Sequence, residues 1–82
     1  MRRGPSPLPR RHTNPALRET ALALRRPLWS IALDAGFLHV SQFSTLLNAT
    51  AVADTPGNIQ RLERIAAVIG FPRERLFVDG GR

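Results

Sequence analysis

The spacing of the apolar residues constrains the fold of this 82-residue chain more than any other feature. Between positions 17 and 69, apolar residues recur at intervals of three and four, which is the repeat of one face of a helix. No segment shows the alternation of apolar and polar residues that is typical of a half-buried strand. We therefore predict an all-α protein of one domain, because a chain this short cannot form two cores.

Local signals place the ends of the helices. A capping residue followed by proline marks a start, and a glycine in the left-handed conformation marks an end. The residues predicted for these roles are Thr13 or Asn14, Gly36, Thr55 and Gly70. Together with the apolar spacing they predict five helices, which cover approximately residues 15–24, 27–35, 40–48, 56–69 and 72–77.

The composition divides the chain into three regions. Residues 1–12 hold four arginines and little that can pack, which predicts a flexible basic arm. Residues 13–78 form the folded domain, and residues 79–82 are expected to fray. Trp29 lies off the apolar stripe of the second helix, and we expect it to join the core by packing on the first helix.

Several classes of protein are not expected. The chain has no cysteine and two isolated histidines, so we predict no metal site and no cofactor. The six acidic residues are scattered, no nucleophile has a partner base and no glycine-rich phosphate loop is present, so we do not expect an enzyme. Without a long apolar run or a signal peptide, we expect no contact with a membrane and a cytoplasmic location.

The positive charge is unevenly distributed. The net charge is +6 and all twelve basic residues are arginine, which suits planar contacts to phosphate. Residues 27–60 contain no arginine, so the charges flank the middle of the chain. This pattern indicates a polyanionic partner such as nucleic acid, although charge also keeps small proteins in solution.

The middle of the chain has the pattern of a helix-turn-helix. Two short helices meet at a tight turn, with the small Ala32 where they approach and Gly36 at the turn. From about Leu17 to Phe77 the chain resembles the lambda-repressor-like family of DNA-binding domains, which includes the Cro and Xre types. The stretches that carry the resemblance are "IALDAG", "LLN", "IQRLERIAAVIGFP" and "RERLF". It implies a compact five-helix domain whose second and third helices are the helix-turn-helix.

Two features of the turn keep alternatives open. The connection "GFLH" is one residue longer than is usual in that family, so the register of the third helix is open by one residue. The stretch "IALDAGF" with Ser41, Phe43 and Ser44 is also similar to half of an AraC-type DNA-binding domain. The fourth and fifth helices favour the lambda-repressor type.

The helix-turn-helix interpretation assigns roles to side chains. Uncharged polar groups on the third helix can read base edges, while arginines beside it supply affinity through phosphates. The predicted base contacts are His39, Val40, Ser41, Gln42, Ser44, Thr45 and Asn48. The predicted phosphate contacts are Arg10, Arg11, Arg25, Arg26 and Arg61. The alternative is that this polar face is ordinary solvated surface.

These roles predict a small transcriptional regulator of prokaryotic or phage type, most simply a repressor, that binds specific double-stranded DNA as a homodimer. The residues expected at the dimer interface are Phe71, Leu76, Phe77 and Val78, which alternatively close the core of a single chain. The alternative function is a protein-interaction module on the same fold, such as an antitoxin or an accessory protein of a polymerase or larger regulator.

Overall fold

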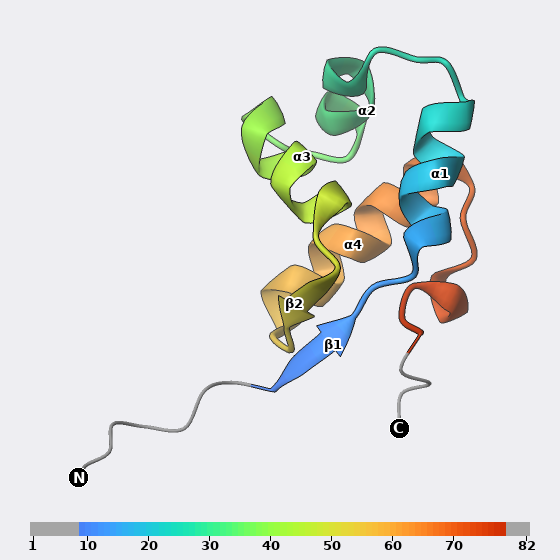
Figure 1. The fold of residues 1–82 in the computed structure, drawn as a ribbon. Coiled ribbons are helices and arrows are strands. Elements are labelled where there is room, and N and C mark those ends of the chain that lie inside the picture. Colours follow the sequence, from blue (N-terminus) through green and yellow to red (C-terminus); the bar gives the residue numbers. More distant parts are fainter. Residues whose placement is uncertain (1–8, 79–82) are drawn as a thin grey trace, which may run out of the picture.

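A computed structural model describes residues 9–78 of the chain (Figure 1). The predicted arm up to residue 8 and the predicted frayed end, residues 79–82, lie outside the described residues. The elements in chain order are β1 (Arg10–His12), α1 (Pro15–Ala23), α2 (Leu28–Asp34), α3 (Val40–Asn48), β2 (Ala51–Ala53), α4 (Pro56–Ile69) and the single 3₁₀ turn η1 (Arg73–Arg75).

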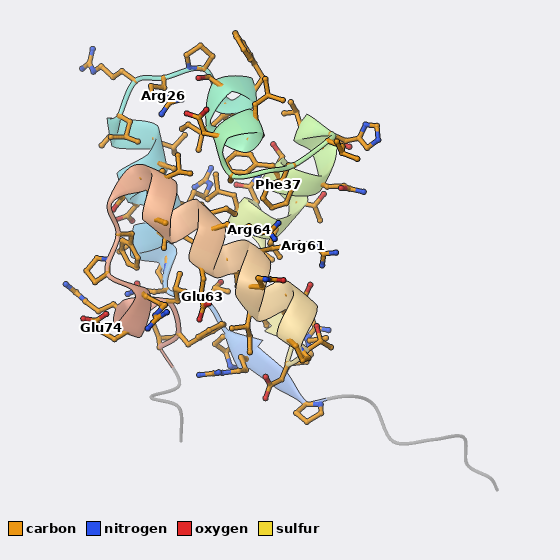
Figure 2. The ribbon with its side chains drawn as sticks, turned by 180° about the vertical axis from the view of Figure 1, so that it is seen from behind. Arg26, Phe37, Arg61, Glu63, Arg64 and Glu74 are labelled. Carbon is orange, nitrogen blue, oxygen red and sulfur yellow. The ribbon has the colours of Figure 1, made fainter. Side chains whose placement is uncertain are left out.

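The helices form two layers. α4 lies on one side of the molecule and α1, α2 and α3 lie on the other, as the opposite views of Figures 1 and 2 show. α4 packs on α1 and α2, and α3 packs on the same two helices. The largest fully buried side chains come from every layer and from the C-terminal segment: Leu17, Ile31, Phe43, Leu62, Ile65 and Leu76.

The predicted capping residues lie at the starts of α1 and α4, and the predicted glycines follow the ends of α2 and α4. The Asn14 side chain accepts a hydrogen bond from the Ala16 amide at the start of α1, and the Thr55 hydroxyl does the same for Asn58 at the start of α4. Gly36 and Gly70 have φ values of 86° and 79°, in the left-handed region that a side chain disfavours. These predictions of capping and stopping residues are confirmed.

The prediction of a purely α-helical fold is wrong at the N-terminal arm. Residues 10–12 form β1, which pairs antiparallel with β2 in the register Arg10 with Ala53 and His12 with Ala51. Val52, at the centre of β2, is buried, so the small sheet contributes to the core. Three-residue strands are too short to show an alternating pattern, and their pairing depends on residues about forty positions apart.

The predicted fifth helix is also wrong, because only η1 is helical in that segment. Leu76 turns into the core, and the backbone then becomes extended. Phe77 forms an antiparallel bridge with Thr13, and the Val78 amide donates to the His12 carbonyl. Pairing with the start of the folded domain uses the backbone groups that a longer helix needs.

Trp29 does not fill the core as expected. Its side chain is 58% exposed, while the buried side of α2 is formed by Ile31 and Ala32. Because Ile31 and Ala32 form the side of α2 that packs inward, Trp29 lies off that side and its indole faces solvent.

Candidate nucleic-acid interface

A tight turn joins α2 to α3. Gly36 adopts the left-handed conformation, and the Phe37 amide donates to the Ala32 carbonyl at 2.9 Å, which ends α2. The buried ring of Phe37 meets the ring of Phe43 edge to face, with centroids 5.6 Å apart. His39 is the N-cap residue and α3 begins at Val40. The third helix therefore spans Val40–Asn48, as the apolar spacing predicts.

The side of α3 that faces away from the core is polar and uncharged. Phe43 and Leu47 are buried, whereas Ser41, Gln42 and Thr45 are exposed. Ser44 is half-buried. Among the other predicted base contacts, His39, Val40 and Asn48 are exposed. Three hydrogen-bonding side chains therefore share one accessible face over the first two turns of the helix.

A groove of about 390 Å³ runs between this face of α3 and the first half of α4. Ser41, Gln42 and Thr45 line one wall, and Asn58 and Arg61 line the other. Phe37 and Leu46 provide its apolar part. The structure thus brings three predicted base contacts together with one predicted phosphate contact.

Asn58 and Arg61 are held in different ways. The Asn58 amide group donates to the Ala53 carbonyl at 3.0 Å, so its orientation is fixed by the end of β2. The guanidinium of Arg61 lies 3.5 Å from Oδ1 of Asn58 and is exposed. Arg61 is consequently anchored beside the groove while its charge remains accessible to solvent.

Arg64 is a neighbouring cation that the sequence analysis missed. Its Nη1 atom lies 3.5 Å from the position that a Cβ of Gly36 would occupy, so it reaches from α4 to the turn before α3. Figure 2 shows Arg61 and Arg64 on the side of α4 where Phe37 lies, with Glu63 on the other side. The spacing of Asn58, Arg61 and Arg64 by three residues was the available signal, because such residues share a helix face.

Asn48 stands apart from the groove at the end of α3. Its Oδ1 atom accepts a hydrogen bond from Nε of Arg18 on α1 at 2.5 Å. Asn48 does not line the groove with Ser41, Gln42 and Thr45. The contact fastens the last turn of α3 to α1 and uses one of the two lone pairs of this amide oxygen.

The two arginines before α2 differ in their surroundings. Nη2 of Arg26 lies 2.6 Å from Oδ2 of Asp34 and 2.6 Å from the Ser30 hydroxyl, so its charge is largely balanced along α2. Arg25 is exposed and has a φ of 59°. Within residues 9–78 it is the non-glycine residue whose backbone lies in the left-handed region. Arg25 is therefore the more accessible cation of the pair.

Arg10 and Arg11 extend from β1, near the end of the molecule opposite the link between α1 and α2 (Figure 1). The Arg10 guanidinium donates to the Ala51 carbonyl at 3.0 Å. The guanidinium of Arg11 lies 3.9 Å from the centre of the Phe77 ring, a cation–π contact. Both side chains contribute to holding β1 on the domain.

The four residues predicted for a dimer interface are in different environments. Phe71 and Leu76 are 8% and 1% exposed and belong to the core. Phe77 is half-buried beneath Arg11, and Val78 is 55% exposed. A contact through this segment therefore depends mainly on Val78.

Within residues 9–78, no group of three or more potential ligand side chains is arranged to hold a metal ion. No helix in the same part of the chain is long and apolar enough to cross a membrane.

Comparisons with models of protein families, with curated proteins and with solved structures gave no match.

Proposed function

We propose that this protein is a transcriptional regulator of the lambda-repressor-like type that binds specific double-stranded DNA through α3. The observation that carries the proposal is the groove where Ser41, Gln42 and Thr45 of α3 face the exposed Arg61 of α4. An α-helix fits the major groove, and hydrogen-bonding side chains on its outer face meet base edges there.

The chemistry of α3 suits base recognition. The amide of Gln42 can donate and accept at once, which is the arrangement that pairs with the N6 and N7 atoms of adenine. The hydroxyl groups of Ser41 and Thr45 can donate to or accept from any base. An uncharged face also distinguishes bases by hydrogen-bond pattern without strong attraction to every phosphate.

The proposal assigns DNA affinity to exposed arginines outside that face. Arg61 and Arg64 extend from α4 on the side of the turn, and Arg25 is exposed before α2. A non-glycine residue in the left-handed region costs about 1 kcal/mol or more. An exposed arginine at such a position, as Arg25 is, supports a role for its charge in contacting phosphate.

A regulator of this kind acts by occupying a site near a promoter, and it needs no cofactor for that. We place it in the cytoplasm, where the DNA of a prokaryotic cell is found. One recognition helix reads only a few base pairs, so the proposed site is an inverted repeat bound by two copies, with half-sites about one helical turn apart.

Selection of bound sequences from a random pool of duplexes tests the proposal. We expect enrichment of a defined site whose affinity falls steeply with salt, because each neutralised phosphate contributes a slope of about −0.9 in log K against log salt. Failure to enrich any sequence at low salt contradicts the proposal.

A protein-interaction module is the second candidate function. Leu38, in the turn, is 87% exposed, and Val40, at the start of α3, is 41% exposed. Apolar side chains beside the polar face suit a protein partner better than a phosphate backbone. This alternative predicts no enriched duplex and a partner affinity that is nearly independent of salt.

A further inference from the structure

The outward side of α2 exposes two large apolar residues. Trp29 and Leu33 are 58% and 60% exposed, and their spacing of four residues puts them one turn apart on the same helix face. We call this pair the α2 stripe. Water-exposed indole and isobutyl groups one helical turn apart are typical of a surface that another protein covers.

The flank of the α2 stripe is electrically balanced. Ser30 and Asp34 follow Trp29 and Leu33 in the sequence, and the Arg26 guanidinium bonds to both of them at 2.6 Å. This contact runs along the helix beside the α2 stripe and cancels one positive charge against one negative charge. The charges beside the α2 stripe are thus balanced, and the exposed Arg25 lies before the helix.

That neutrality matters because the chain carries a net charge of +6. Two copies repel one another wherever their arginines meet. Residues 27–60 contain no arginine, and the preceding Arg26 is paired with Asp34. Trp29 and Leu33 share this arginine-free part of the chain with the exposed Leu38 and Val40, and they are the two that lie one turn apart on the same helix.

We propose that the α2 stripe binds the same stripe of a second copy of this chain across a two-fold axis. Such an axis sets Trp29 of one copy against Trp29 or Leu33 of the other, so that one patch serves both partners. The proposal does not depend on DNA binding, since neither residue lines the groove beside α3.

The size of the α2 stripe indicates a weak complex. An aromatic side chain offers about 150–250 Å² for burial, whereas a standard stable interface covers about 800 Å² on each partner. Trp29 and Leu33, already about two-fifths buried, supply only part of that area. We therefore expect dissociation constants of about 10 µM to a few hundred micromolar for the free protein.

The chain contains its own reporter, because Trp29 is the one tryptophan in the sequence. Tryptophan emission and sedimentation equilibrium are measured on the full-length protein from about 1 µM to about 1 mM, which brackets a weak complex. We expect the emission maximum to move to shorter wavelength as concentration rises, in parallel with a rise in average mass towards that of a dimer.

Two matched variants identify the surface. Leu33→Glu puts a charge in the α2 stripe and keeps the reporter, and it should raise the dissociation constant at least about tenfold. Val78→Glu makes the same kind of change at a residue of similar exposure, 55% against 60%, and should leave association unchanged. Both should retain the helical circular dichroism of the parent; should Leu33→Glu unfold, Leu33→Ser replaces it.

The possible results separate the proposal from its rivals. A chain that stays monomeric to about 1 mM with constant emission overturns the proposed self-association. The α2 stripe is then assigned to binding a different protein. Loss of association in Val78→Glu but not in Leu33→Glu also overturns it, and assigns the contact to the C-terminal segment. Equal dissociation constants for Leu33→Glu and the parent protein also overturn the proposal.

Discussion

The Nε atom of Arg18 on α1 lies 2.5 Å from Oδ1 of Asn48, the last residue of α3. Recognition of adenine by an amide side chain uses the acceptor and the donor together. For Asn48 one lone pair of the acceptor is already engaged and the Arg18 guanidinium lies against it, whereas Gln42 is exposed in the groove beside α3. Of the two amides predicted to read bases, Gln42 is therefore accessible to a base, whereas Asn48 already bonds to Arg18.

The first prediction compares those amides. Gln42→Ala should lose about 1–3 kcal/mol of discrimination at particular base pairs, and Asn48→Ala should lose clearly less. Binding of variant sites to each protein is measured by fluorescence anisotropy. Gln60→Ala is the control, because Gln60 is an exposed residue of α4 that lies outside the groove. A uniform loss on all sequences for Gln42→Ala contradicts base reading.

The second prediction concerns the two arginines of α4 near the turn. Arg61→Gln and Arg64→Gln should each weaken binding to all duplexes alike, and each should reduce the salt slope by about one unit. Arg75→Gln makes the same change of charge on η1, which lies away from α3 in both views, and should have little effect. Equal slopes for all three variants would show that only net charge matters.

The third prediction separates charge from backbone conformation at Arg25. Arg25→Gly removes the charge and relieves a φ of 59°, so the free energy of unfolding should stay level or rise by up to about 1 kcal/mol. DNA affinity should nevertheless fall on every sequence. Thermal unfolding and binding titrations measure the two effects. Unchanged affinity with raised stability excludes Arg25 from the interface.

The fourth prediction uses a matched pair of glycines. Gly36→Ala and Gly57→Ala each place a Cβ 3.5 Å from an arginine Nη1 atom, which is an ordinary contact, but only Gly36 has a positive φ. Gly36→Ala should destabilise by about 1–2 kcal/mol. Gly57→Ala, inside α4, should stabilise by up to about 1 kcal/mol.

Urea unfolding followed by circular dichroism gives both values. Similar destabilisation by the two substitutions would indicate that the added methyl group displaces the neighbouring arginine. In that case the conformation of the turn before α3 is not what requires glycine at position 36.

Much of the helical framework follows from short-range signals. Asn14 and Thr55 cap the amides next to them, and Gly36 and Gly70 permit a backbone conformation that other residues resist. Such effects act within one or two turns of a helix, so the sequence alone contains them. The polar face of α3 was predictable for the same reason, since apolar residues at helical spacing specify which side is buried.

Tertiary structure decided the features that join distant segments. The pairing of β1 with β2 and the bridge between Thr13 and Phe77 join segments that are far apart in the chain, so no local pattern predicts them. The same is true of Asn48, whose acceptor bonds to Arg18 from another helix, and of Arg64, which reaches the turn at Gly36. The sequence by itself determined the four longer helices and which of their sides are apolar. Which polar groups remain accessible depends on how those helices pack, because packing brings together hydrogen-bonding partners that are far apart in the chain.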